Sequence, residues 1–214
     1  MDYEQMNNNR VTLMGRIVEK PTYSHEIYGE GFYESKIAVK RLSEQEDILP
    51  ITISERLLGE PVQEGDMLAL TGQFRSYNKL EETRSRLMLS VFVRELLPYD
   101  EETNPNEAEL SGYICKPPVY RTTPFKREIC DLLLAVNRAF NKSDYIPCIA
   151  WGRNARFVKT LPVGERIKIN GRIQSREYQK QLENGDIVVK TAYEVSISRI
   201  TVEKAAGEVV AEKN

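Results

Sequence analysis

Two large aromatic side chains stand six residues apart in a short apolar segment, DYIPCIAW, at residues 144–151. Side chains of a β-strand alternate between its two faces, so Tyr145 and Trp151 would share one face. The opposite face of the segment is small and apolar, which suits a tightly packed core. Flat rings on an exposed strand face are the groups on which unpaired bases stack. The segment therefore predicts either a stacking surface or ordinary packing of two rings.

Cations alternate with apolar residues in a second segment, ERIKINGRIQSREY, at residues 165–178. Ile167, Ile169 and Ile173 fall on one face and fit the interior of a barrel. The other face carries four cations, no carboxylate and a terminal ring: Arg166, Lys168, Arg172, Arg176 and Tyr178. Cations bind phosphates and rings stack on bases, and a groove for single-stranded nucleic acid needs both. A solvated outer strand face is the other interpretation of this pattern.

Composition and charge indicate a folded chain with two unlike halves. Hydrophobic residues make up 41% of the 214 residues, enough to build a core. No apolar run approaches the roughly 20 residues of a membrane-spanning helix, and we expect a cytosolic protein with no membrane contact. Residues 1–105 hold 12 basic and 19 acidic residues, a net charge of −7. Residues 106–214 hold 18 and 13, a net charge of +5, which predicts two units with different partners.

The two halves repeat the same sequence landmarks. Gly15 matches Gly112, and DILPITIS at residues 47–54 matches the aromatic segment at 144–151, both at an offset of 97 residues. Farther along, VQEGDMLALTGQFRS matches LPVGERIKINGRIQS at an offset of 99 residues, which a loop insertion explains. A period near 97 residues is too long for a solenoid. The chain is therefore predicted to be a duplicated small domain.

Each copy is predicted to be an all-β, five-stranded Greek-key barrel of the OB type, with a short helix between strands three and four. In the second copy the expected strands are 107–117, 127–138, 144–151, 165–178 and 187–202, with a helix in 152–161. The predicted organisation is an N-terminal barrel over 1–97, a linker over 98–106, a C-terminal barrel over 107–202 and a short tail over 203–214. A small β-sandwich is the alternative, although a sandwich requires no helix at that point.

The first copy lacks the paired aromatic and cationic pattern. Its third strand has no ring, and its fourth strand presents Met, Ala and Thr on the outer face before Arg75 and Tyr77. An acidic domain with such a face is better suited to contact with protein than with a polyanion. We expect at most a secondary site there, at Arg75, Tyr77 and Tyr33, and loop packing is the alternative role of these aromatic residues.

Sequence signatures of catalysis and metal binding are missing. The chain has a single histidine, His25, and neither a GxSxG motif nor a phosphate-binding loop. Its three cysteines lack metal-ligand spacing: Cys115, Cys130 and Cys148. We therefore expect no enzymatic activity, no cofactor and no metal site, and we expect the cysteines to be reduced thiols in the core.

Four ordered segments of the second copy resemble the bacterial single-stranded DNA-binding protein family. They are LLLAVNR at 132–138, DYIPCIAWGRNA at 144–155, GERIKINGRIQSREY at 164–178 and EVSI at 194–197. The resemblance implies an OB fold whose third and fourth strands stack bases on aromatic residues, here Tyr145, Trp151 and Tyr178. Phe140, which follows the LAVNR segment, is a looser fourth candidate.

The resemblance also implies a ligand and an assembly. Single-stranded DNA would be bound without sequence specificity, with backbone contacts from Arg166, Lys168, Arg172, Arg176, Arg138 and Arg153. Because the family assembles four barrels and this chain carries two, a homodimer is expected, in the bacterial cytosol or nucleoid and with replication or repair proteins as partners. The family's acidic, aromatic C-terminal tip is missing, which argues against recruitment by that route.

Two other functions remain open on sequence alone. OB folds serve many roles, and the degenerate acidic first half fits an adaptor that binds protein within a replication or mobile-element complex. Binding of single-stranded RNA is also possible, because stacking does not distinguish ribose from deoxyribose.

Overall fold

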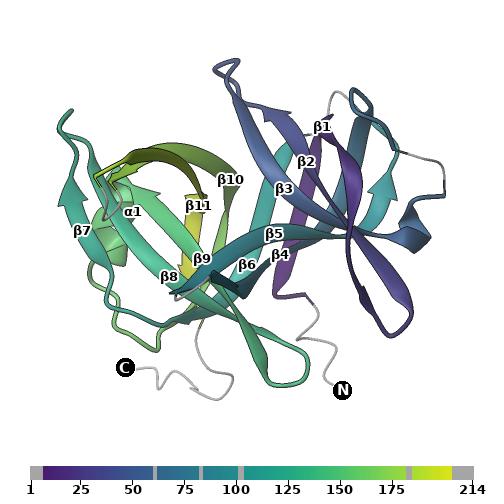
Figure 1. Ribbon diagram of the computed structural model, residues 1–214. Coiled ribbons are helices and arrows are strands. Elements are labelled where there is room, and N and C mark those ends of the chain that lie inside the picture. The colour runs from purple at the N-terminus through teal and green to yellow at the C-terminus, as the bar shows by residue number, and fades with distance from the viewer. Residues whose placement is uncertain (1–6, 60–61, 82–83, 101–103, 182–184, 204–214) are drawn as a thin grey trace.

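The computed structural model describes residues 7–59, 62–81, 84–100, 104–181 and 185–203 (Figure 1). The first half contains β1 (Asn9–Ile27), β2 (Glu30–Lys40), β3 (Glu46–Ser54), β4 (Met67–Glu81) and β5 (Arg84–Leu97). The second half contains β6 (Asn106–Ile114), β7 (Val119–Thr122), β8 (Glu128–Arg138), β9 (Lys142–Trp151), α1 (Gly152–Val158), β10 (Arg166–Gln181) and β11 (Ile187–Val202). The prediction of an all-β chain is confirmed, and the strands of the second half begin and end close to the expected residues.

Each half closes into its own barrel. The strands form one continuous 11-stranded sheet in the order β2-β3-β5-β4-β1-β6-β10-β11-β9-β8-β7. Additional pairings of β2 with β1 and of β6 with β8 join the ends of each half, so that five strands close on each side of the β1–β6 contact. Figure 1 shows the two barrels side by side, with β1 and β6 at the centre. This arrangement agrees with the predicted pair of OB-type barrels.

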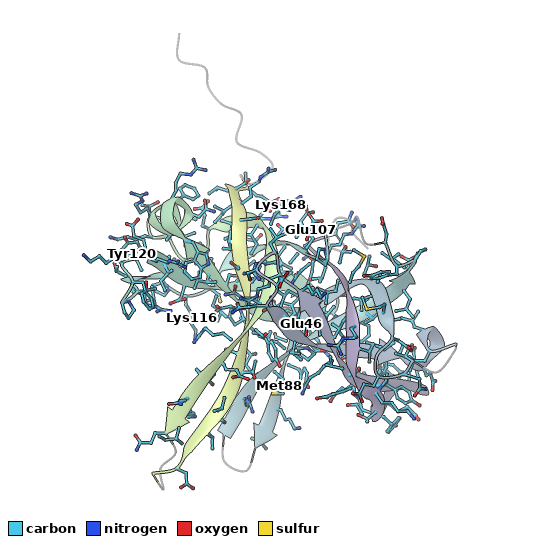
Figure 2. The ribbon with its side chains drawn as sticks, turned by 90° about the horizontal axis from the view of Figure 1, so that it is seen from above. Glu46, Met88, Glu107, Lys116, Tyr120 and Lys168 are labelled. Carbon is cyan, nitrogen blue, oxygen red and sulfur yellow. The ribbon has the colours of Figure 1, made fainter. Side chains whose placement is uncertain are left out.

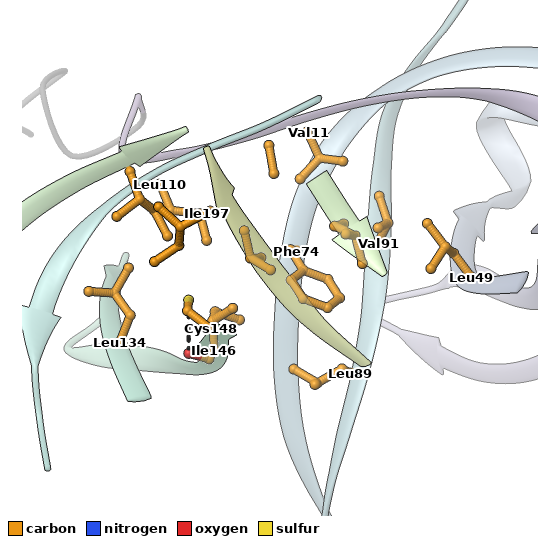
Figure 3. Close-up of a cluster of buried hydrophobic side chains, with 14 of the residues drawn as sticks. Val11, Leu49, Phe74, Leu89, Val91, Leu110, Leu134, Ile146, Cys148 and Ile197 are labelled. Carbon is orange, nitrogen blue, oxygen red and sulfur yellow. Dashed lines mark hydrogen bonds between the residues drawn. The ribbon is translucent and has the colours of Figure 1, made fainter. Parts of the chain in front are cut away.

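The barrels are filled by the alternating apolar residues of their strands. Ile167, Ile169 and Ile173 of β10 are fully buried, as the alternation predicts. Figure 3 shows some of the buried side chains of each half, among them Leu134 and Ile146 in the second and Phe74 in the first. Each such side chain contributes about 1.5–3 kcal/mol when it is removed from water. The cores therefore hold the outer strand faces rigidly in place.

Helical structure differs between the two halves. In the second half α1 follows β9 as predicted, and it buries Ala155 and Val158 against the barrel. In the first half the expected short helix between strands three and four is a single 3-10 turn over Glu55–Leu57. None of its three residues is fully buried, although Leu57 packs partly buried against the core. Gly59, a poor helix former, follows within two residues.

Glycines allow the strands to cross closely where each barrel closes. A Cβ atom at Gly112 of β6 would lie 2.4 Å from the carbonyl oxygen of Ala135 in β8, and the corresponding distance from Gly15 to the carbonyl of Ala38 is 2.1 Å. No side chain fits at either distance without a shift of backbone. The shared pair Gly15 and Gly112 is thus explained by barrel closure.

Replacement of Gly112 by alanine is expected to destabilise the second barrel. Because the new methyl group meets backbone rather than a flexible side chain, we expect a loss of about 1–3 kcal/mol in the free energy of unfolding. Urea denaturation followed by circular dichroism measures it. Gly59→Ala is the control, since nothing lies within 4 Å of a Cβ atom at that position. Equal midpoints for the two variants would contradict the explanation.

The contact between the barrels has an internal two-fold symmetry. Strands β1 and β6 pair antiparallel about Val11 opposite Ala108, two residues that are themselves 97 apart. Two further backbone hydrogen bonds mirror each other, because the amide of Met14 donates to Pro105 and the amide of Ser111 donates to Asn8, both at 2.8 Å. Each half thus offers the same surface to the other, as in an isologous dimer.

Buried carboxylates tie each barrel to the other. Asp47 at the start of β3 accepts a hydrogen bond from the backbone amide of Ser175 in β10 at 2.7 Å. Its counterpart Asp144 in β9 accepts one from the amide of Ser76 in β4 at 2.8 Å. Both carboxylates are almost fully buried. These crossed contacts fix the relative position of the two outer faces.

The ends of the predicted domains are ordered where the structure describes them. Strand β5 ends at Leu97 and β6 begins at Asn106, the last residue of the linker predicted over 98–106, and 101–103 lie outside the described residues. Most of the predicted tail, 204–214, also lies outside them. Within the described part of the chain, no helix combines the length and the apolar character needed to cross a bilayer.

Candidate nucleic-acid interface

The second barrel has a groove of about 440 Å³ beside its tryptophan, which we call the Trp151 groove. Ile149, buried beneath the surface of β9, lines it together with Gln174 of β10 and Glu194 of β11. Five arginines also line it: Arg41, Arg121, Arg127, Arg172 and Arg176. The structure therefore brings one predicted stacking residue together with two predicted phosphate contacts, Arg172 and Arg176.

Trp151 is held at the edge of this groove by a hydrogen bond. Its indole Nε1 donates to the hydroxyl oxygen of Ser196 in β11 at 3.2 Å. The side chain remains 38% exposed, so part of the ring surface faces solvent. A ring fixed on a strand and open on one side can accept a base without reorganising. The six-residue spacing from Tyr145 does place both rings on the outer face, since Tyr145 is 45% exposed.

The cationic face of β10 is largely neutralised by neighbouring strands. Arg166 pairs with Glu203 at 3.1 Å and Lys168 with Glu109 at 3.0 Å. The remaining pairs are Arg172 with Asp47 at 3.1 Å and Arg176 with Glu194 at 4.0 Å. The strand face itself has four cations and no carboxylate, as the sequence indicates, but neighbouring strands and the first barrel supply the acids. Alternation within one strand does not reveal which side chains the adjacent strands provide.

Two of these pairs differ in their availability to a ligand. The hydrogen bond from Lys168 lowers the pKa of the Glu109 carboxyl, and both side chains are well exposed. Such an exposed pair is worth about 1 kcal/mol or less and can open to phosphate. Arg172 instead binds a carboxylate that is almost fully buried, at the contact between barrels. Of the two, Arg172 has the stronger structural role.

Tyr178 lies in a second groove, of about 460 Å³, formed by both barrels and called here the inter-barrel groove. Two hairpins, β4–β5 and β10–β11, project side by side from the barrels (Figure 2) and form its walls. Tyr77 lines it from the first hairpin and Pro147 from β9. The two grooves are neighbours, because Arg176 and Tyr178 lie two residues apart on one face of β10.

Six predicted residues of the second barrel line neither groove: Arg138, Phe140, Tyr145, Arg153, Arg166 and Lys168. Phe140 is 86% exposed in the turn between β8 and β9, and Arg138 pairs with the buried Asp144 at 3.4 Å. Arg153 is exposed on α1. Lys168 lies at the end of the molecule opposite the projecting hairpins (Figure 2). The structure thus divides the predicted site rather than gathering it into one surface.

The predicted secondary site in the first barrel is divided as well. Tyr33 packs edge-to-face against Tyr23, with ring centroids 5.8 Å apart. Tyr77 faces the inter-barrel groove, and Arg75 lies over the ring of Phe92, 4.1 Å from its centroid. Only Tyr77 of the three therefore lies beside a predicted stacking residue, Tyr178.

Sequence reasoning missed the arginines that line the Trp151 groove from the β7–β8 hairpin. Arg121 pairs with Asp131 at 2.7 Å, and the hydrogen bond to that carboxylate raises the pKa of Arg121. Arg127 makes no ion pair with any carboxylate in the described part of the chain. The signal was the basic run around TTPFKRE, but β7 is four residues long and was not predicted as a strand.

Comparisons with known proteins agree with the geometry. The family model described as "Single-strand binding protein family" matches residues 105–203. The chain is 37% identical over 83 residues to the single-stranded DNA-binding protein 1 of Staphylococcus aureus, covering 36% of this chain and 50% of that protein. It is 35% identical over 83 residues to the single-stranded DNA-binding protein A of Bacillus subtilis, covering 36% of this chain and 48% of that protein.

A solved structure resembles the whole chain. The wild-type single-stranded DNA binding protein from Thermus aquaticus superposes with a TM-score of 0.69 at 18% identity, covering 94% of this chain and 95% of the other. This likeness supports the fold of both halves. In sequence, by contrast, the chain spans about half the length of the relatives that it matches.

Proposed function

Residues 105–203 form a domain of the single-strand binding protein family, and on that premise we propose that the chain binds single-stranded DNA. The observation that carries the proposal is the Trp151 groove, where one exposed ring lies among five arginines. Rings that stack on bases and cations that contact phosphates bind a strand with little regard to its sequence. The chain thereby acts as a binding protein in replication, recombination or repair, not as an enzyme.

The second barrel provides the main path for the strand. A base stacks on Trp151 while Arg121, Arg127 and Arg176 contact the flanking phosphates. From there the strand continues along β10 into the inter-barrel groove, where Tyr178 provides a further ring. Tyr145 and Lys168 remain candidates that this path does not require.

The oligomeric state and the location follow from the family rather than from the site. We propose a homodimer, which would combine four barrels in one assembly, acting in the bacterial cytosol. The first barrel then supplies the fixed contact with the second through β1 and β6. Replication or repair proteins are the proposed partners.

Titration of tryptophan fluorescence tests the proposed function directly, because Trp151 is the only tryptophan in the chain. We expect oligo(dT) of about 35 nucleotides, enough to cover two barrels at the usual site sizes, to quench the emission strongly. Raising the salt concentration should weaken binding, with a slope of log K against log salt of about −0.7 for each phosphate contact.

Other outcomes of this titration point to other functions. A gel shift without quenching would move the strand away from Trp151. If there is no quenching and no gel shift at low salt, the remaining function is that of an adaptor that binds protein. The proposed contacts do not involve the 2′-hydroxyl, so they should not favour RNA over DNA. Tighter binding to a matched RNA oligonucleotide would therefore show that other contacts recognise this hydroxyl and that RNA is the ligand.

A further inference from the structure

Two arginines of the first barrel share one aromatic ring, Phe92 of β5. The guanidinium carbon of Arg75 lies 4.1 Å from the ring centroid, and that of Arg94 lies 5.1 Å from it. The side-chain oxygen of Gln73 accepts hydrogen bonds from both, at 2.8 Å from Arg75 Nη2 and 3.3 Å from Arg94 Nη2. Two like charges are thus held together by a ring and a neutral amide.

The positive charge of Arg75 and Arg94 is not balanced by nearby carboxylates of the described residues. In the described part of the chain, neither Arg75 nor Arg94 forms an ion pair with a carboxylate. The carboxylate whose charge acts on Arg75 is Asp144, which already pairs with Arg138 and accepts a hydrogen bond from the amide of Ser76. Burial first, and then the charges of Arg94 and Arg138, lower the pKa of Arg75 to about 10. On β10 of the second barrel, by contrast, every predicted cation pairs with a carboxylate, although Arg172 shares Asp47 with Arg41.

The cluster occupies the place that the Trp151 groove has in the second barrel. Gln73 of β4 corresponds to Arg172 of β10, 99 residues later in the repeat. Phe92 of β5 lies opposite Gln73, and Ser196 of β11, which accepts the hydrogen bond of the Trp151 indole, lies opposite Arg172. At the position that corresponds to Trp151, the first barrel has Ser54, whose hydroxyl donates to Glu30. The ring of the first barrel therefore comes from its last strand instead of its third.

We propose that Arg75, Phe92 and Arg94, with Arg138 from the second barrel, form a second site that binds phosphate groups of the same single strand. The inference rests on the proposed function and extends the path of the strand. Tyr77 is two residues from Arg75 on one face of β4, and it lines the inter-barrel groove together with Tyr178. A strand that leaves the Trp151 groove through the inter-barrel groove therefore reaches the cluster.

The chemistry of the cluster favours phosphate over base. The guanidinium groups of Arg75 and Arg94 lie over Phe92, so they occupy the ring surface on which a base would stack. Planar guanidinium groups bind phosphate oxygens in pairs, and the ring holds them in orientation. Bringing an anion to two like charges in a partly buried position also relieves their repulsion.

The test is a salt series with the double variant Arg75→Gln/Arg94→Gln in the full-length chain. Anisotropy of labelled oligo(dT) of about 12 and about 35 nucleotides compares a strand that fits one barrel with one that fits two. For the long strand we expect about tenfold weaker binding at low salt and a slope of log K against log salt that is shallower by about 1.4, the value for two lost phosphate contacts. Binding of the short strand and its quenching of Trp151 should not change.

A matched control removes the same charge elsewhere on the barrel. Arg16 and Lys40 are exposed beside Glu46, at the start of β3. They lie away from the cluster, because Phe92 lies opposite Thr52, six residues farther along β3. Arg16→Gln/Lys40→Gln is therefore expected to keep the wild-type slope. The unfolding midpoint of the test variant should be equal to or higher than that of the wild type, because a repulsion has been removed.

Three outcomes would overturn the inference. An unchanged slope for the long strand with the test variant shows that the cluster contacts no phosphate, while quenching of Trp151 still supports the proposed function. An equal loss in the control variant shows a general effect of charge. If the wild-type chain neither quenches nor binds, the proposed function itself fails and the second site fails with it.

Discussion

Replacing Trp151 by alanine is expected to weaken binding of oligo(dT) by roughly 5- to 150-fold, the equivalent of about 1–3 kcal/mol for one stacked base. The ring is 38% exposed and lines the groove with five arginines, so its removal deletes the stacking surface and leaves the cations in place. The salt dependence should therefore stay close to that of the wild type. Anisotropy of a labelled oligonucleotide measures both quantities, since the variant has no tryptophan emission.

Two further variants separate stacking from loss of structure. Trp151→Phe keeps a ring at the same position and should recover most of the affinity. Phe157→Ala removes a ring of similar exposure, 41%, from α1 outside both grooves, and it should bind as the wild type does. The indole also donates to Ser196, so thermal unfolding must confirm that Trp151→Ala stays folded. Wild-type affinity in a folded Trp151→Ala variant would remove the ring from the site.

The sequence predicted the features that depend on local alternation and on the repeat. The strands of the second half, the buried isoleucines of β10 and the outward placement of Tyr145 and Trp151 all follow from a period of two residues. The repeated pair Gly15 and Gly112 follows from the close approach of strands where each barrel closes. These properties are set by residues that are neighbours in sequence or that occupy equivalent places in the two copies.

The features that were missed depend on contacts between distant strands. The carboxylate that pairs with Arg172 is Asp47, which lies 125 residues earlier in the chain. Phe92 stands in an apolar strand, VFV, where periodicity gives no sign that arginines would cover it. The carboxylates beside the cations of β10 and the ring beneath Arg75 were therefore both missed for one reason. Charge balance on a sheet is a property of neighbouring strands, not of one strand.

Asp47→Asn is expected to lower the free energy of unfolding by about 3–5 kcal/mol, the usual cost of removing one partner from a buried ionic network. Asp47 is fully buried and accepts two hydrogen bonds from the guanidinium of Arg41, one of them 2.7 Å long. It also accepts from Arg172 at 3.1 Å and from the amide of Ser175 at 2.7 Å. Urea denaturation at neutral pH measures the loss.

Asp144→Asn is the control, because Asp144 is the counterpart of Asp47 in the repeat. Burial raises the pKa of Asp144 above its usual 3.8, so the charged form costs stability once the pH exceeds that raised value. As the pH rises from below 3.8 through the raised pKa, this carboxyl therefore lowers the stability of the wild type. Asparagine removes that cost and can still accept from Ser76, so we expect a loss of about 1 kcal/mol or less. Equal losses in the free energy of unfolding for Asp47→Asn and Asp144→Asn would contradict the different roles given to these two carboxylates.

The same substitution at Asp47 also bears on binding, because Arg41 and Arg172 line the Trp151 groove. In the wild type a phosphate must compete with a buried carboxylate for Arg172, and the carboxylate is already held in place by the fold. Without that charge both guanidinium groups become available, so a folded Asp47→Asn chain should bind oligo(dT) more tightly at low salt and with a steeper salt dependence. Stability and affinity would then change in opposite directions. Such a result would identify Asp47 as the residue that limits the positive charge of the groove in order to join the two barrels.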